Sequence, residues 1–463
     1  MIKAVRGTRD LLPPETALWN VVEAAVRDVF RAYNFQEIRT PIFEATELFA
    51  RGVGEETDIV AKEMYTWEDR GGTLSNKFGE LLDLVDLARQ NPASTPTLDT
   101  VKLFNEYLGP GKWKGQSLTL RPENTAGVVR AYIEHQLWDR GLNKLYYIGP
   151  QFRRERPQKG RYRQFYQIGA EVIGPASAGS ERPIRDAEVL EMLDTLLRRL
   201  GIADFTLYIN SVGDAGDRAA YNDALRKALQ PVVGQMCTDC QRRAVTNPLR
   251  VFDCKVPEDQ PIIATLPLIS SYLGDQSKEH FQSVQALLKE AGVAFEVNPR
   301  LVRGLDYYTR TAFEFTHGAL GAQNAILGGG RYDGLAELLG SPQPAPGIGF
   351  AIGEDRLVMA LHARASETAP SVDAYIAPVG EGMNRKALRL AGDLRREGLV
   401  VELGDRSFRL KKMFEAATKA GAKYILIVGE NEVKADAFAV KNLATGKQVS
   451  VARGELARRI RGE

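Results

Sequence analysis

The sequence has few features of a membrane or secreted protein. No run of about 18 apolar residues occurs in the 463-residue chain, so it offers no candidate transmembrane helix. The N-terminal stretch MIKAVRGTRD lacks the apolar core that a signal peptide needs. We therefore expect a cytoplasmic protein that does not enter a membrane.

Cysteine is also scarce, with only Cys237, Cys240 and Cys254 in the chain. Three cysteines cannot form a fully paired disulfide framework, which is typical of a reducing compartment. The Cys-x-x-Cys spacing could begin a zinc site, but no fourth ligand follows at a sensible spacing, because His280 lies 26 residues after Cys254. We predict free thiols and no metal site, with structural zinc as the less favoured alternative.

Net charge is nearly absent, since 61 Lys and Arg face 59 Asp and Glu. No global field therefore draws the protein onto nucleic acid. Positive charge is instead concentrated between Asp139 and Arg163, where eight cationic residues face two acidic ones. Such a surplus on one loop indicates a local anion site, although a solvated basic face is the commoner explanation of such a loop.

The order of predicted elements indicates several domains, as expected for this length. A helix with apolar residues at helical spacing follows Pro13-Pro14, and an extended segment follows around Pro41. Strand-rich sequence runs from Ser117 to about Ile173, helices and the cysteines follow, and strands return from Leu301. After ASETAPS, residues 365–371, strands alternate with helices, which is typical of a small parallel α/β domain.

Along the predicted strands, polar side chains alternate with apolar ones and so lie on one face of the sheet. In FYQIGAEVI, period two puts Phe165, Gln167 and Glu171 opposite a core face that contains Ile168 and Ala170. The stretch SLTLRPE adds Arg121 and Glu123, and LVRGLDYY, taken as the start of a strand, adds Arg303, Asp306, Tyr307 and Tyr308. These segments predict a pocket for a polar zwitterion beside a polyphosphate.

Arginine suits the phosphate side of such a pocket. Its planar guanidinium donates two parallel hydrogen bonds and keeps its charge at physiological pH. No GxxxxGK[ST] loop is present, so any nucleotide site is of another design.

Several long stretches together resemble the class II aminoacyl-tRNA synthetases. RTPIFE, FRRERPQKGRYRQFYQIGAEVIG and GIGFAIGEDRL resemble motifs 1, 2 and 3 of that class. LVRGLDYYTRTAFEF and GGGRYD resemble the two signature peptides of the histidyl-tRNA synthetase family. The likeness covers most of the chain and is interrupted chiefly at 72–116, an insertion of unknown purpose where the family usually has a tight hairpin.

The resemblance implies an α+β fold. It consists of a class II catalytic domain, with a mixed, mainly antiparallel sheet flanked by helices, and a C-terminal α/β anticodon-binding domain. We expect the catalytic domain over 1–364, with a helical insertion at about 214–285, a linker at 365–371 and the anticodon-binding domain over 372–463. The family works as a homodimer through motif 1, and Pro41 fits such an interface.

The resemblance also implies roles for single residues. Arg153 would contact the α-phosphate of ATP, Phe165 and Arg356 would enclose the adenine, and Arg303 would lie between the α-phosphate and the histidine carboxylate. Arg153 and Arg303 are therefore the expected catalytic residues. The expected histidine-binding residues are Glu123, Thr125, Gln167, Glu171, Tyr307 and Tyr308.

Imidazole recognition gives a chemical reason for part of this set. A neutral imidazole has one hydrogen-bond donor and one acceptor, so a carboxylate can accept from one ring nitrogen while a phenol donates to the other. A site that pairs both ring nitrogens rejects apolar isosteres without an editing domain.

The expected tRNA contacts lie in two places. Arg156 and Gln158, at the tip of the cationic loop, would approach the acceptor end. Lys144, Lys159 and Arg161 are either further phosphate contacts or solvated side chains. In the C-terminal domain, the stretch GDRSFRLKKMF offers an aromatic residue among cations, notably Arg406, Arg409 and Lys411.

Two residues depart from the commonest family pattern. Asn124 replaces glycine in RPENT, where we expect tolerance of left-handed backbone. Asp355 replaces glutamate in GEDRL, which leaves the geometry of a catalytic metal open.

The implied activity is histidine–tRNA ligation. The enzyme would activate L-histidine with ATP and Mg²⁺, and would pass the histidyl group to tRNA(His). The alternative is the synthetase-like, histidine-binding regulatory subunit of ATP phosphoribosyltransferase, which lacks the C-terminal domain and typically loses motif arginines.

Overall fold

The computed structural model describes residues 2–54, 57–69, 116–158, 160–320, 324–362 and 372–463. The chain forms two compact units. The first contains Met1–Asp10 and Val22–Arg364, and the second contains Leu11–Val21 and Ala365–Glu463. No helix within the described ranges is long and apolar enough to cross a membrane.

An eight-stranded sheet forms the centre of the first unit, in the order β1-β5-β6-β11-β10-β9-β7-β8. Only the β1–β5 and β7–β8 pairs are parallel, so the expected mixed, mainly antiparallel sheet is confirmed. The strands are β1 (Gln36–Glu37), β5 (Asn143–Phe152), β6 (Gln164–Ile173), β7 (Phe205–Ser211), β8 (Glu296–Val297), β9 (Thr309–His317), β10 (Ala325–Arg331) and β11 (Gly347–Gly353).

The two faces of this sheet follow the period-two prediction. Ile168 and Ala170 of β6 are buried on the face where Phe30 of α1 packs against Tyr146, with ring centroids 5.2 Å apart. The neighbouring residue Tyr147 points to the opposite face and packs in an apolar cluster with helices α5 and α11. The flanking helices are α1 (Glu15–Ala32), α2 (Thr46–Val53), α5 (Thr125–Glu134), α6 (Pro183–Arg199), α10 (Asp275–Glu290), α11 (Leu335–Leu338) and α12 (Glu354–His362).

The first unit also has a separate three-stranded sheet, in the order β2-β4-β3. Its strand β4 ends directly before the RPENT stretch. Its strands are β2 (Phe43–Ala45), β3 (Tyr65–Asp69) and β4 (Gln116–Leu120), and the short π-helix η1 (Ile59–Glu63) precedes β3. Asp69 pairs with Gln116 across the β3–β4 ladder. The 72–116 insertion therefore connects two adjacent antiparallel strands, and apart from Gln116 it lies outside the described residues.

Residues 301–308 are a loop and not the beginning of a strand, so that part of the prediction was wrong. β9 begins only at Thr309. The reason is a side-chain contact: the Arg218 guanidinium donates to the carbonyls of Asp306 and Tyr308, at 3.2 and 2.7 Å, in place of strand partners. Arg303, Tyr307 and Tyr308 therefore project from a loop.

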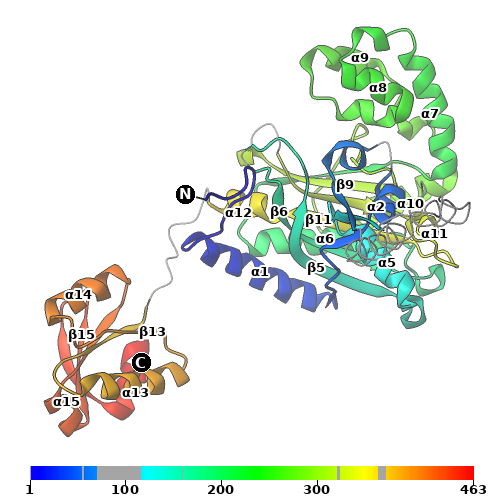
Figure 1. Ribbon diagram of the computed structural model, residues 1–463. Coiled ribbons are helices and arrows are strands. Elements are labelled where there is room, and N and C mark those ends of the chain that lie inside the picture. The colour runs from blue at the N-terminus through cyan, green and yellow to red at the C-terminus, as the bar shows by residue number, and fades with distance from the viewer. Residues whose placement is uncertain (1, 55–56, 70–115, 159, 321–323, 363–371) are drawn as a thin grey trace, which may run out of the picture. The chain divides into compact units, whose positions relative to one another are not determined.

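The helical insertion forms a lobe at one end of the sheet (Figure 1). Its main helices are α7 (Ala215–Leu229), α8 (Thr238–Thr246) and α9 (Gln260–Thr265), joined by the short 3-10 turns η4 (Val233–Gln235), η5 (Pro248–Asp253), η6 (Pro257–Asp259) and η7 (Ile269–Ser271). The lobe has its own apolar cluster, which contains Cys240 and Cys254.

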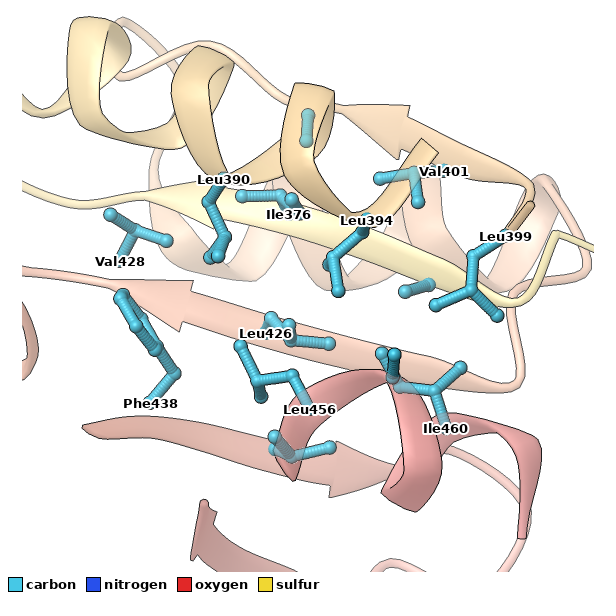
Figure 2. Close-up of a cluster of buried hydrophobic side chains, with 14 of the residues drawn as sticks. Ile376, Leu390, Leu394, Leu399, Val401, Leu426, Val428, Phe438, Leu456 and Ile460 are labelled. Atoms are coloured by element: carbon cyan, nitrogen blue, oxygen red, sulfur yellow. The ribbon is translucent and has the colours of Figure 1, made fainter. Parts of the chain in front are cut away.

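The second unit has a five-stranded sheet in the order β13-β12-β14-β15-β16, with the first three strands parallel, which confirms the α/β prediction. Its elements are β12 (Ala374–Pro378), α13 (Met383–Arg396), β13 (Val401–Leu403), α14 (Leu410–Lys419), β14 (Tyr424–Val428), α15 (Glu430–Ala435), β15 (Ala437–Asn442), β16 (Gln448–Ala452) and α16 (Leu456–Arg461). Leu390 of α13 and Leu456 of α16 meet Leu426 in one apolar layer, as Figure 2 shows. Met413 of α14 packs in a second cluster with Ile425, which faces away from Leu426.

A buried carboxylate, Asp186 of α6, joins four elements of the first unit. It pairs with Arg331 of β10, and both side chains are fully buried. It also accepts hydrogen bonds from Thr311 of β9 at 2.6 Å and contacts His280 of α10 at 2.8 Å. Burial alone would raise the pKa of Asp186, but the Arg331 charge and the His280 contact lower it to about 2.

We expect Asp186→Asn to lower the free energy of unfolding by about 3–5 kcal/mol, because the substitution removes the fully buried partner of Arg331 and leaves the buried guanidinium with Asp333 as its remaining ionic partner. Chemical denaturation of the full chain would measure it. The matched control is Asp28→Asn, whose half-exposed carboxylate pairs with Arg199 and should contribute less than about 1 kcal/mol. Equal losses in the two variants would contradict the proposed importance of Asp186.

Glu354 begins α12 and is fully buried, and its carboxylate oxygens have no hydrogen-bond partner among the described residues. Burial, with the nearby charges of Glu23 and Asp355, raises its pKa to about 8. Folding therefore favours the protonated acid. Stability should fall as pH rises from the unfolded pKa near 4.5 to about 8, and should change no further above that.

Glu354→Gln should remove this dependence. Relative to the unmodified chain, the variant should gain about 2 kcal/mol or more of stability between pH 5 and pH 9. Unfolding curves at both pH values would measure the change. A stability difference that does not vary with pH would rule out a buried, protonated Glu354.

Candidate active site

Residues from five strands of the main sheet, β5, β6, β9, β10 and β11, and from the loops beside them line one cavity of about 340 Å³ on the α5 face of the sheet. All but one of the predicted catalytic, histidine-binding and ATP-binding residues line it: Glu123, Thr125, Arg153, Phe165, Gln167, Arg303, Tyr307, Tyr308 and Arg356. The remaining one, Glu171, lies directly behind the lining. The predicted convergence of these distant segments is therefore present in the structure.

Glycines in β10 and β11 leave room for the side chains of the cavity. A Cβ on Gly328 would collide with the Arg303 guanidinium, and a Cβ on Gly330 would come within 2.8 Å of the Tyr308 ring. A Cβ on Gly349 would collide with the Glu171 carboxylate. The glycine-rich strands thus permit large polar side chains to lie flat against the sheet.

Glu171 closes one end of the cavity through short hydrogen bonds. Its carboxylate accepts from Thr125 Oγ1 at 2.7 Å and from Tyr332 Oη at 2.6 Å. Burial raises the pKa of Glu171 to about 8, although these two hydrogen bonds oppose the shift. The two hydroxyl partners hold the Glu171 side chain in place.

Glu123 joins the same end to helix α5. Its two oxygens accept from the backbone N–H groups of Thr125 and Ala126, at 2.7 and 3.0 Å, and so cap the helix. Burial raises the pKa of Glu123. Nearby, Gln167 Oε1 is buried without a hydrogen-bond partner among the described residues. An ammonium group could use both acceptors.

Two tyrosines missed by the sequence reasoning complete this end. Tyr332, from the GGGRYD stretch, holds Glu171 as described above. Tyr147 lines the cavity, and its buried hydroxyl has no partner in the described part of the chain. The signal for Tyr147 was the alternation of KLYYIG, which places it on the face of Gly149 and opposite Tyr146.

Arg303 lies on the opposite wall, within the cavity. Its Nη1 donates to Glu314 Oε1 at 2.8 Å, while Nε is buried without a partner among the described residues. The guanidinium therefore keeps hydrogen-bonding capacity for an anion in the cavity.

Arg153 and Phe165 lie together at the base of the cationic loop. The Arg153 guanidinium is 5.2 Å from the centroid of the Phe165 ring, and its Nε donates to the Pro122 carbonyl at 2.8 Å. Arg356, at the start of α12, donates to the Ala325 carbonyl at 2.7 Å. Together with Arg303, these two arginines line the cavity with positive charge, which suits a polyphosphate.

The remaining cations of the loop have different surroundings. Arg163 donates to the Arg6 carbonyl at 3.1 Å, and Arg161 pairs with Glu155 at 3.1 Å. Arg156 and Gln158 are exposed at the tip, as predicted for a surface that meets a partner. Lys159 lies outside the described residues.

Three predictions about individual residues were wrong. Lys144 is neither solvated nor free for phosphate, because it pairs with Glu188 at 2.6 Å and is largely buried. Asp306 lies outside the cavity and accepts from Asn247 at 2.6 Å. Arg121 also lies outside it and donates to the Thr40 and Pro150 carbonyls, at 3.0 and 2.9 Å.

Asn124 does not adopt left-handed backbone, so the tolerance expected of asparagine in RPENT is not required here. Its φ is −115° and its side-chain oxygen accepts from Thr40 Oγ1 at 2.7 Å. The side chain therefore connects RPENT to the segment around Pro41.

The carboxylates that line the cavity do not form a metal cage. Glu155, Glu314 and Asp355 each contact an arginine, namely Arg161, Arg303 and Arg9. Asp355 also accepts from the Tyr166 backbone N–H at 3.2 Å. These donors do not fit a dedicated Mg²⁺ site, and a magnesium ion would need other ligands, such as phosphate and water.

In the second unit, the predicted RNA-binding side chains lie at the start of α14. Arg406 and Arg409 are exposed in the β13–α14 loop, and Lys411 is exposed on the first turn of the helix. Phe408 is also exposed, with Lys412 Nζ 5.4 Å from its ring centroid. The loop thus offers an aromatic surface among cations, as single-stranded RNA recognition needs.

Comparison with known proteins matches both units. The Histidyl-tRNA synthetase family model matches residues 108–357, and the Anticodon binding domain model matches residues 373–463. Similar proteins include "Histidine--tRNA ligase" of Koribacter versatilis, 66% identical over 100% of this chain and 96% of that protein. The protein of the same description from Solibacter usitatus is 54% identical over 99% of both.

A solved structure is similar over nearly the whole chain. The apo histidyl-tRNA synthetase of S. aureus is 34% identical, with a TM-score of 0.75 over 99% of this chain and 100% of that one. The family match and the identity over the full length of the chain lead to one conclusion. The chain belongs to the histidyl-tRNA synthetase family of class II aminoacyl-tRNA synthetases.

Proposed function

We propose that the protein is a histidine–tRNA ligase that uses L-histidine, ATP and tRNA(His). The observation that carries the proposal is the single cavity in which Arg153 and Arg303 face Glu123, Thr125 and Gln167. Residues 1–364 would be the catalytic domain and residues 372–463 the anticodon-binding domain. We propose that the protein acts as a cytoplasmic homodimer.

In the first step, a carboxylate oxygen of histidine attacks the α-phosphorus of ATP. A new P–O bond forms, the bond between the α-phosphorus and the bridging oxygen breaks, and pyrophosphate leaves with the electron pair. Arg153 and Arg303 would stabilise the negative charge that builds up on the α-phosphate oxygens. No side-chain nucleophile is required.

In the second step, the terminal ribose hydroxyl of the tRNA attacks the histidyl carbonyl and AMP leaves. Arg156 and Gln158, exposed at the loop tip, are the proposed contacts to the acceptor end. Magnesium would enter with the nucleotide and would supply charge neutralisation on the phosphates.

Selection of histidine would take place at the Glu171 end. Glu123 and Gln167 would hold the α-ammonium group, with Thr125 beside them. Glu171, with Tyr307 and Tyr308 on the neighbouring wall, would form hydrogen bonds with the two imidazole nitrogens. A site of this kind leaves buried polar groups unpaired when an apolar amino acid enters, which explains selectivity without editing.

The regulatory-subunit alternative is less well supported. That protein lacks an anticodon-binding domain, whereas residues 373–463 match one here. Histidine-dependent exchange of pyrophosphate into ATP, without tRNA, distinguishes the two functions, because only the ligase makes the adenylate.

Arg303→Ala should reduce the exchange rate by about 100-fold or more, because loss of a charged transition-state donor costs about 2.7–4 kcal/mol. Histidine affinity, measured by calorimetry, should remain within about tenfold, the effect of about 1.4 kcal/mol. The control is Arg300→Ala, an exposed arginine three residues earlier, which should exchange normally. A parallel collapse of exchange and histidine affinity would contradict the role assigned to Arg303.

Replacing Arg406, Arg409 and Lys411 together by alanine should lower kcat/KM for tRNA charging by about tenfold or more, because each nucleic-acid contact contributes about 1 kcal/mol. Pyrophosphate exchange should not change. The matched control removes three exposed cations elsewhere in the same unit, Lys434, Arg458 and Arg459. If both triple variants charge tRNA equally well, the β13–α14 loop does not bind the tRNA.

A further inference from the structure

We propose that Cys237, Cys240, Cys254 and Asp259 form a structural zinc site in the helical lobe. The ligand atoms of these four residues lie within 4.8 Å of one another. Asp259 would be the fourth ligand that the sequence analysis did not find, and the proposal favours zinc over the free thiols predicted from the sequence. The signal in the sequence was an acid five residues after Cys254, in place of the cysteine or histidine of common zinc motifs.

The spacing of these atoms fits one tetrahedral ion. With Zn–S bonds of about 2.3 Å, tetrahedral geometry places two sulfur ligands about 3.8 Å apart. Cys237 Sγ and Cys254 Sγ are 3.9 Å apart, and Cys254 Sγ is 3.1 Å from Asp259 Oδ2. The sulfur separation is far longer than the disulfide bond length of about 2.05 Å.

Backbone and burial support bound thiolates at this position. The Cys240 N–H points at Cys237 Sγ at 3.5 Å, and the Val256 N–H points at Cys254 Sγ at 3.4 Å. Asp259 is oriented by the Cys237 N–H, at 3.1 Å. Cys240, Cys254 and Asp259 are buried, and Cys237 is partly buried. A buried carboxylate beside deprotonated thiolates would need a cation, which zinc would supply.

The donor set also selects the metal. Three thiolates exclude the hard cations Mg²⁺ and Ca²⁺, which prefer oxygen. An iron–sulfur cluster needs its protein ligands around several iron atoms, further apart than these four atoms lie. Zinc accepts sulfur and carboxylate ligands together in a closed four-coordinate site.

The site would hold the lobe together where its regular structure is weakest. Cys237 precedes α8, Cys254 follows η5, and Asp259 ends η6. These turns are short, so cross-linking them by one ion would fix their arrangement.

The same turns reach the catalytic unit's η1 segment. Arg242 of α8 pairs with Asp58 at 2.8 Å, and Arg243 and Arg250 lie 3.7 Å from the same carboxylate. A hollow beside the active-site cavity is lined by Arg250, Asp253 and Cys254 together with Arg153. Zinc would therefore also position the arginines of the lobe beside the cavity.

The test is metal analysis of the untagged full chain, purified without chelator or added metal. Mass spectrometry of the metals should find about one zinc per chain, and no other transition metal in comparable amount. Titration with a mercurial reagent, in the presence of a zinc indicator dye, should release the zinc as three thiols react. The expected zinc content of Cys240→Ser and Asp259→Asn is less than about a tenth of that value.

The control variant is Glu258→Gln, which alters an exposed acid next to Asp259 and should keep its zinc. Loss of zinc from a misfolded variant would prove nothing, so the unmodified chain carries the decisive measurement. The proposal is overturned if that chain contains no zinc, whether it shows three freely reactive thiols or a disulfide. Zinc that persists in Cys240→Ser and Asp259→Asn overturns it as well.

Discussion

The active site depends on the buried pair of Asp186 and Arg331 on the far side of the sheet from the cavity. Arg331 ends β10, and the next residue, Tyr332, lies on the cavity side and holds Glu171. Glu171 in turn accepts from Thr125, whose backbone N–H is bonded to Glu123. The peptide bond between Arg331 and Tyr332 and three hydrogen bonds therefore connect the interior ion pair to the start of helix α5. A fully buried charge pair fixes geometry at a cost in desolvation, which is reasonable where position matters more than stability.

The cavity has hydrogen-bond acceptors at one end and cations at the other. Acceptors with raised pKa values, Glu123 and Glu171, lie at the closed end, whereas Arg153, Arg303 and Arg356 face the part suited to phosphates. Each arginine has a carbonyl or carboxylate partner that orients it before ligand binding. Such preorganised charge needs little rearrangement when charge develops on the α-phosphate.

Much of this arrangement could be predicted from the sequence because period-two alternation and long motifs are local signals. They correctly placed Gln167 and Glu171 on one face of β6 and led to the family and the mixed sheet, and nine of the ten site residues that they predicted line the cavity. Loop 301–308 was mistaken for a strand because Arg218, from the distant helical lobe, satisfies its carbonyls. The Lys144–Glu188 pair was missed for a similar reason, since it forms only through a tertiary contact. Tyr147 and Asp259 did have local signals, the alternation of KLYYIG and an acid five residues after Cys254, but the sequence analysis did not use them. The roles of the individual site residues remain predictions.

The most direct test of the account is a crystal structure of the protein with a non-hydrolysable analogue of histidyl-adenylate. The account predicts that the group replacing the α-phosphate lies within hydrogen-bond distance of Arg153 and Arg303. The imidazole should lie at the end closed by Glu171 and Tyr308, and the ammonium group beside Glu123. An analogue bound outside this cavity, or bound with its imidazole toward the arginines, would contradict it.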